Sequence, residues 1–208
     1  EFESGGSLSA DQIFGAYGLS NPNPGESPDY AKLPNERSFG TVTLADSADQ
    51  TLIGSSDADM IDAGAGNDVL QGNAGNDYLI GGQGNDRYLF GRGDGQDTIN
   101  NFSNLANETD QLVLGDGITK DDLWFTQQGQ SLVIDVAGSN DRITVDHWFN
   151  GEAHQLDEIH AGRDVLLNSR VDALVSAMAS FENPAAGEMD IAKQVKDDTA
   201  TALAVAWQ

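Results

Sequence analysis

The chain has 208 residues and a mass of 22.0 kDa, enough for one or two domains with a buried core. Its 34 acidic residues outnumber its 10 basic ones, and the net charge of -24 argues against nucleic acid or an anionic membrane surface as a partner. Cysteine is absent, which excludes disulfides and thiolate metal sites, and no apolar run approaches the roughly 18 residues of a membrane span. Asp supplies 25 of the 34 carboxylates, so a bound hard cation is the simplest way to neutralise the chain.

Residues 1–44 show little periodicity and are interpreted as a linker or as the end of a preceding domain. The first seven residues are acidic and rich in Gly and Ser, without the basic start and apolar stretch of a Sec-type signal. Turn-forming Asn-Pro and Ser-Pro pairs follow between residues 21 and 29. If the protein is secreted, its export signal is expected elsewhere.

From residue 45 to residue 99 the chain repeats with a period of nine. The triplet Gly-Asn-Asp recurs in step, and a large apolar residue follows each Asp by two positions. The frame extends backward to Asp59 with Ile61 and forward, after a two-residue insertion, to Asp97 with Ile99. The three complete copies are Gly66-Asn67-Asp68 with Leu70, Gly75-Asn76-Asp77 with Leu79, and Gly84-Asn85-Asp86 with Tyr88.

The chemistry of one repeat predicts a tight turn followed by a short strand. Gly, Asn and Asp tolerate left-handed backbone and suit the turn, whereas the last three positions suit a strand whose middle side chain points inward. Because nine residues cannot bury a face alone, two repeats are expected to form one coil of 18 residues and the coils to stack. Carbonyl and carboxylate oxygens then line both outer edges at a fixed pitch, which suits Ca²⁺ better than Mg²⁺. Four repeats in register disfavour a disordered Gly/Asp-rich linker.

The pattern G-G-x-G-x-D-x-U-x, with U a large apolar residue, resembles the RTX (repeats-in-toxin) family of proteins exported by type I secretion. The resemblance implies an all-β fold, a right-handed parallel β-roll over residues 45–99 that binds Ca²⁺ between turns one coil apart. Asp59 would then pair with Asp77, Asp68 with Asp86, and Asp77 with Asp97. The 54–59 turn matches least well, because Asp replaces a glycine there. The metal-binding residues that the resemblance implies are Asp57, Asp59, Gly64, Gly66, Asp68, Asn73, Gly75, Asp77, Gly82, Gly84, Asp86 and Asp97.

Residues 100–165 are expected to form a β-rich cap that closes the end of the roll. Alternating apolar runs predict strands, and Trp124, Phe125, Trp148 and Phe149 supply bulk for a core. The segment resembles the haemolysin-related flanking domain that follows such repeats, and Asp110 is placed outside the array. The expected strands are 110–114, 122–125, 131–136 and 141–145.

Residues 166–208 are predicted to form a helical tail. Apolar residues at helical spacing start at Val171 and end at Phe181, and Asn183-Pro184 would end this helix. The Ala-rich end resembles the uncleaved C-terminal signal of type I substrates. The alternative is an ordinary C-terminal helix packed on the cap.

No catalytic motif is found in the sequence. His147, His154 and His160 lack the His-Glu-x-x-His spacing of zinc proteases, and neither a Gly-x-Ser-x-Gly elbow nor a Walker loop is present. The chain itself is therefore predicted not to be an enzyme, although a catalytic domain could lie upstream.

The resemblance implies a module that folds on Ca²⁺ after secretion, at the C-terminal end of an adhesin, toxin or exoenzyme. Its expected partners are calcium ions and the type I secretion machinery, and its expected location is extracellular or on the cell surface. The alternative is an accessory module of a secreted enzyme or adhesin that binds carbohydrate or peptide. Exposed rings at Trp124 or Trp148 would favour that alternative, and burial would favour a role in the core.

Overall fold

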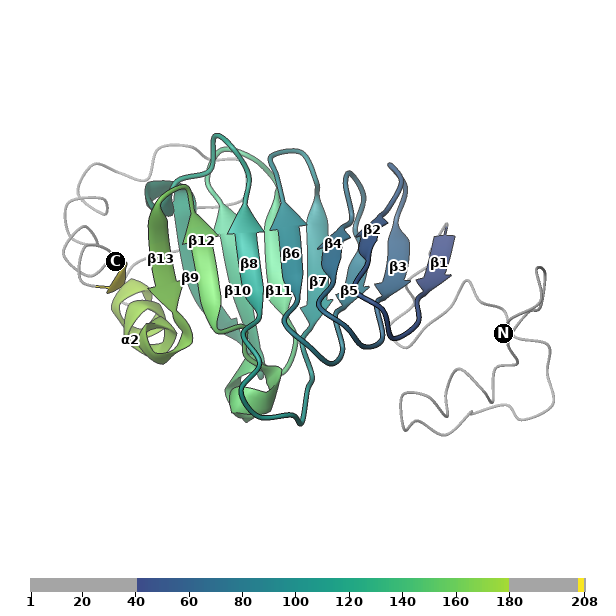
Figure 1. The fold of residues 1–208 in the computed structure, drawn as a ribbon. Coiled ribbons are helices and arrows are strands. Elements are labelled where there is room, and N and C mark those ends of the chain that lie inside the picture. Colours follow the sequence, from purple (N-terminus) through teal and green to yellow (C-terminus); the bar gives the residue numbers. More distant parts are fainter. Residues whose placement is uncertain (1–40, 180–205, 208) are drawn as a thin grey trace. The chain divides into compact units, whose positions relative to one another are not determined.

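The computed structural model describes residues 41–179 and 206–207, and these residues are almost entirely β-structure (Figure 1). A single longer helix, α2 (Asn168–Met178), follows the last strand within the described part of the chain. Short 3-10 helices are η1 (Lys120–Asp122), η2 (Trp148–Asn150) and η3 (Glu152–His154). The strands are β1 (Thr41–Leu44), β2 (Thr51–Ile53), β3 (Asp59–Asp62), β4 (Val69–Gln71), β5 (Tyr78–Ile80), β6 (Arg87–Phe90), β7 (Gln96–Asn100), β8 (Gln111–Leu114), β9 (Leu123–Gln128), β10 (Ser131–Val136), β11 (Arg142–Val145), β12 (Glu158–Ala161) and β13 (Asp164–Leu167).

The strands form two sheets, and the chain alternates between them through the repeats. One sheet has the order β1-β3-β5-β7-β11-β10-β9, and the other has the order β13-β12-β8-β6-β4-β2. Each repeat strand pairs in parallel with the strand two places further along the chain, as Leu79 of β5 does with Ile99 of β7 and Leu70 of β4 with Tyr88 of β6. This alternation confirms the parallel β-roll that the nonapeptides predict.

The middle residue of each repeat strand fills the space between the sheets. Ile61, Leu70, Leu79, Tyr88 and Ile99 are all at most 2% exposed. On β4 and β6 the neighbouring positions are more accessible, in keeping with the period of two that a strand imposes, whereas Met60 on β3 and Ile80 on β5 are buried as well. One large side chain per nine residues therefore builds most of the core of the roll, and Ala63 and Phe90 add to it.

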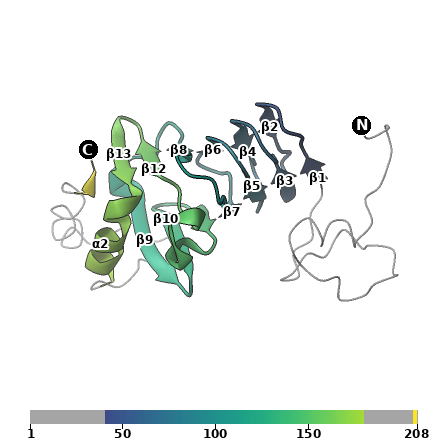
Figure 2. The same ribbon diagram turned by 60° about the horizontal axis from the view of Figure 1, so that its bottom comes forward.

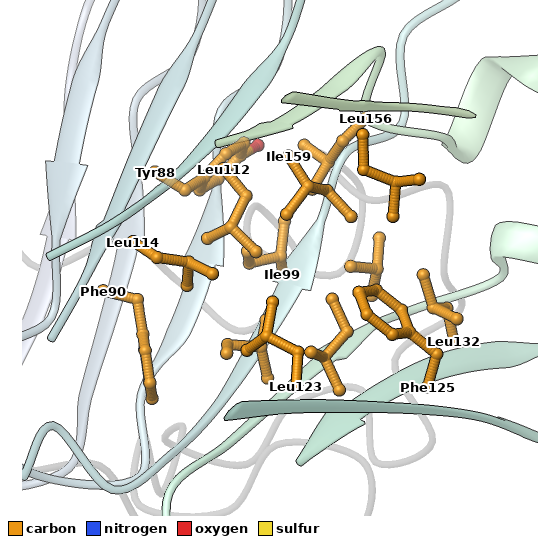
Figure 3. Packing of buried hydrophobic residues seen from close by; sticks show 14 of the residues in the cluster. Tyr88, Phe90, Ile99, Leu112, Leu114, Leu123, Phe125, Leu132, Leu156 and Ile159 are labelled. Carbon is orange, nitrogen blue, oxygen red and sulfur yellow. The ribbon is translucent and has the colours of Figure 1, made fainter. Parts of the chain in front are cut away.

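Both sheets continue beyond the repeats. β8 pairs in parallel with β6, β11 with β7, and β12 with β8, so the two-layer arrangement runs on past residue 99. The β9–β10 hairpin lies between β8 and β11 along the chain. In space it extends the sheet that contains β11 by two strands (Figure 2). Figure 3 shows Ile99, Leu112 and Ile159 facing the same interior as Leu123, Phe125 and Leu132. The core of the roll is therefore continuous with the core of the segment that follows.

The aromatic residues of the expected cap lie in this core, as predicted. Trp124, Phe125 and Trp148 are at most 3% exposed, and Phe149 packs against the cluster while partly buried. All four strands expected between residues 110 and 145 are present, and their bounds agree to within one residue except that β9 continues three residues further, to Gln128. β12 and β13, which the sequence did not indicate, complete the second sheet.

The two ends of the described part show one unexpected strand and one expected helix. Thr41–Leu44, read from the sequence as the end of a linker, forms β1 and pairs with β3. α2 buries Val171, Leu174, Val175 and Met178, the stripe that the helical spacing predicts, against β9 and β13. Phe181 and the expected helix end at 183–184 lie outside the described residues. In the described part of the chain, no helix has the length and apolarity required to cross a membrane.

Candidate metal centre

The turns of the roll adopt backbone conformations that only certain residues tolerate. Gly82 and Gly84 have φ values of 92° and 125°, and a Cβ on either one would collide with the carbonyl oxygen of Gly64 or Gly66 in the preceding coil. Positive φ recurs at the same two positions of each well-matched repeat, which are Gly64 and Gly66, Asn73 and Gly75, and Gly82 and Gly84. Glycine therefore lets successive turns stack closely enough to bring their carbonyl oxygens into columns.

The 54–59 turn departs from this geometry, as the sequence indicates. Ser55 and Asp57 occupy the two glycine positions, and neither has a positive φ. The Asp57 side chain is exposed, whereas its carbonyl oxygen lies against Gly75 of the next coil. Asp57 therefore contacts the turn of the next coil through its carbonyl oxygen and not through its carboxylate.

The repeat Asp side chains form one ladder along each edge of the roll. On one edge, the backbone N–H of Asp59 donates to Asp77 Oδ1 at 2.7 Å, and the N–H of Asp77 donates to Asp97 Oδ1 at 3.0 Å. On the other, the N–H of Asp68 donates to Asp86 Oδ1 at 2.9 Å. All three pairings that the resemblance implies are therefore brought together across neighbouring coils.

The second carboxylate oxygen of each of these residues has no donor. Within the described residues, these oxygens are fully buried without a hydrogen-bond partner, and the carboxylates themselves are at most 2% exposed. A buried carboxylate oxygen without a partner is strongly unfavourable, because it has lost its water. The five atoms are Asp59 Oδ1, Asp68 Oδ2, Asp77 Oδ2, Asp86 Oδ2 and Asp97 Oδ2.

This arrangement fits a hard cation bound by oxygen. Carboxylates and carbonyls are the donors that Ca²⁺ prefers, and its flexible coordination of six to eight oxygens suits a mixed set. In the described part of the chain, no three His, Asp or Glu side chains converge into a cage of their own. The stacked carbonyls must therefore supply part of any ligand set.

Burial disfavours the charged form of the same carboxylates. It raises the pKa of Asp77 to about 6, that of Asp86 to about 7 and that of Asp97 to about 8, although a backbone N–H lowers each pKa in part. Neighbouring carboxylates raise the three pKa values further. Burial likewise raises the pKa of Asp68 and Asp110. The ladders therefore need a proton or a cation to compensate their charge.

Asp110 is a correction to the sequence analysis, which placed it outside the array. Its Oδ1 accepts from the backbone N–H of Asp86 at 2.8 Å, and its own N–H donates to Asp157 Oδ2 at 2.9 Å. The ladder therefore runs from Asp68 through Asp86 and Asp110 to Asp157. The available signal was the Asp-x-U spacing, since Leu112 and Ile159 each follow an Asp by two positions. Longer insertions between these copies broke the period of nine and hid them.

The three histidines join no group of three or more metal-ligating side chains within the described residues. The rings of His147 and His154 lie 5.6 Å apart, and His154 also contacts the ring of Phe102 at 5.0 Å. His160 pairs with Glu158 at 2.7 Å. These contacts agree with the interpretation of all three as ordinary polar residues.

Comparisons with known proteins match two segments of the chain. Residues 53–88 match the RTX calcium-binding nonapeptide repeat in four copies, and residues 132–160 match the haemolysin-type calcium binding protein related domain. The iron-regulated protein FrpA of Neisseria meningitidis serogroup C is 37% identical over 69 residues, which is 32% of this chain and 6% of that protein. The match thus spans only a small part of the relative's length.

One solved structure is also similar, the AlgE6R3 subunit of the mannuronan C5-epimerase from Azotobacter vinelandii. The alignment has a TM-score of 0.29 and 21% identity, and it covers 71% of this chain and 88% of that one. The family matches confirm the resemblance that the nonapeptides suggest. This chain therefore carries RTX calcium-binding nonapeptide repeats, whose ion is Ca²⁺, followed by a haemolysin-type related domain.

Proposed function

We propose that this chain is the calcium-dependent folding module at the C-terminal end of a larger protein exported by type I secretion. The observation that carries the proposal is the set of five buried carboxylates that each keep one oxygen without a donor. Such a set is unfavourable without a cation and becomes favourable with one. Folding and ion binding then occur as one event.

The proposed ligands are the repeat carboxylates and the carbonyls of the stacked turns. Asp59, Asp77 and Asp97 serve one edge, and Asp68 and Asp86 serve the other. Asp57 contributes its carbonyl oxygen, because its carboxylate is exposed and stands outside the ladders. The remaining proposed contributors are the turn residues Gly64, Gly66, Asn73, Gly75, Gly82 and Gly84.

The difference in calcium concentration between the cytosol and the extracellular space determines in which of the two the module folds. Extracellular modules bind Ca²⁺ at roughly 10⁻⁴–10⁻³ M, a concentration far above that of the cytosol. Inside the cell the Asp ladders would repel, and the repeats would remain extended for passage through an export channel. Outside, Ca²⁺ would join consecutive coils.

The organisation that supports this function has four parts. Residues 1–44 would connect to the upstream protein, 45–99 would bind the ions, 100–165 would close the roll, and 166–208 would carry the export signal. The activity of the whole protein would belong to other domains. The carbohydrate- or peptide-binding alternative loses its main support, because Trp124 and Trp148 are buried in the core.

A calcium titration tests the proposal. Far-UV circular dichroism should show a largely disordered spectrum over the repeats in EDTA and a β spectrum in millimolar Ca²⁺. The same concentration of Mg²⁺ should not produce this change, since Mg²⁺ demands strict octahedral geometry and retains its water. An identical spectrum in EDTA and in Ca²⁺ would contradict the proposal.

A further inference from the structure

Asp110 continues the ladder of Asp68 and Asp86 but differs from them in one respect. It is 4% exposed, and its Oδ1 accepts from the backbone N–H of Asp86, just as Asp86 Oδ1 accepts from that of Asp68. Its Oδ2, however, accepts from Asn101 Nδ2 at 2.8 Å. At Asp110 a side-chain amide therefore donates to the carboxylate oxygen whose counterpart in the repeat Asp residues has no donor.

The surrounding hydrogen bonds define the orientation of the Asn101 amide. The backbone N–H of Gly81 donates to the Tyr88 hydroxyl at 2.9 Å, so the single hydroxyl proton is free to donate to Asn101 Oδ1, also at 2.9 Å. Asn101 Nδ2 donates to Asp110 and to the Gln155 carbonyl oxygen at 3.0 Å. Asn101 is 3% exposed, and its oxygen and nitrogen each face partners of the required kind.

The other edge of the roll ends in a similar way. Asp141, 6% exposed, stacks on the last turn of that edge. Its Oδ2 accepts from the backbone N–H of Gly93 at 2.9 Å, and its Oδ1 accepts from that of Gly95 at 3.3 Å. At the end of each edge, the carboxylate that follows the repeats is therefore held by protein N–H groups, although Asp141 accepts from the Gly93–Gly95 turn and not from Asp97.

We propose that Asn101 takes the place of a cation at Asp110 and ends the ion column on this edge at Asp86. One N–H of the amide donates to the Asp110 carboxylate, where a repeat would present an ion, and the other donates to the Gln155 carbonyl oxygen. Beyond Asp110, Asp157 is only half-buried, so water can solvate the next carboxylate. The inference rests on the proposed calcium binding of the repeats and assigns the point at which that binding stops.

Counting the bound ions tests the inference. The full chain and its variants are equilibrated with Ca²⁺, and the bound metal per chain is measured by equilibrium dialysis with elemental analysis. Asn101→Asp should bind one more ion than the wild type, because two carboxylates then face each other where an amide faced one. Asn140→Asp, which adds the same charge at an exposed position of the cap, should leave the ion count unchanged.

Two isosteric variants keep the test decisive if Asn101→Asp does not fold. Asp110→Asn should retain the wild-type ion count, whereas Asp86→Asn should lower it. Loss of an ion in Asp110→Asn, or an unchanged count in a folded Asn101→Asp, would overturn the inference while leaving calcium binding by the repeats intact. A wild-type chain that binds no Ca²⁺ would overturn both proposals.

Discussion

The repeats and the segment that follows them share the same two sheets but differ in the interactions that hold the sheets together. In residues 41–99 the strands are three to five residues long, and the buried carboxylates keep unpaired oxygens. In residues 100–179 the β9–β10 hairpin is longer, and Phe125 and Trp148 are completely buried. Both carboxylate oxygens of the ladder residue Asp110, and both of Asp141, accept hydrogen bonds. Under the proposed function the first region depends on an ion, whereas the second is stabilised by apolar burial and side-chain donors.

The reason for the difference is the amount of core that each residue contributes. A nonapeptide places one large side chain inside, and its turn consists of residues that lose much conformational freedom on ordering. The later segment buries aromatic rings and branched side chains on both faces of the hairpin, as the burial of Trp124, Phe125, Leu132, Val133 and Ile134 shows. Burial of such groups stabilises a fold without metal. Three experiments test this difference between the two regions.

The largest effect is expected from Gly84→Ala. Gly84 has a φ of 125°, and a Cβ there would strike the Gly66 carbonyl oxygen, so the coils cannot stack even with Ca²⁺ present. Urea unfolding in saturating Ca²⁺ should show loss of most of the cooperative transition of the repeats. Gly129→Ala is the control, since Gly129 has a φ of 61° and open space around it. It should cost only about 1–2 kcal/mol of unfolding free energy. Equal losses in the two variants would mean that close stacking of the turns is unimportant.

A smaller effect is expected from Asp77→Asn. Asp77 is the middle carboxylate of its ladder, and its uncharged isostere should raise the Ca²⁺ midpoint for folding by about tenfold, because ligand charge sets affinity in such sites. Asp116→Asn removes the same charge from an exposed turn and should leave the midpoint unchanged. Calorimetric titration of both variants measures the difference. If the Ca²⁺ midpoints of the two variants were the same, the carboxylates of the ladder would not be the ligands of the ion.

The smallest effect is expected from pH in the absence of calcium. In the folded roll the pKa values of Asp77, Asp86 and Asp97 are about 6, 7 and 8, above the ordinary value of about 3.9 for an unfolded chain. The folded state therefore binds more protons, and its stability is greatest below pH 4 and falls as pH rises toward 8.

In EDTA, acidification from pH 8 to pH 5 should increase the β content of the repeats measured by circular dichroism, as protons partly replace Ca²⁺. The Asp116→Asn variant should follow the wild type, since that side chain is not part of a ladder. A β content that falls over this range would mean that carboxylate repulsion is not what keeps the calcium-free repeats unfolded.

Most of the roll could be predicted because each local signal agreed with the others. The Asp-x-U spacing predicted both the ladders and the buried column, and the glycine positions predicted the turns that stack. The continuation beyond residue 99 was missed at Asp110, because the insertion before it broke the period while leaving the spacing to Leu112 unchanged. β12 and β13 were missed because their pairing depends on strands distant in the sequence.

The sequence by itself determined the period, the direction of the strands, the choice of a hard oxygen-binding cation and the carboxylates that meet across one coil. These properties follow from local chemistry repeated at a fixed interval, so neighbours in space are known from the spacing alone. The fold places the donors that satisfy Asp110 and Asp141, because these donors come from Asn101 and from the turn at Gly93 and Gly95. Asn101 meets Asp110 because residues 101–110 cross from β7 in one sheet to β8 in the other and bring the two ends of this connection together.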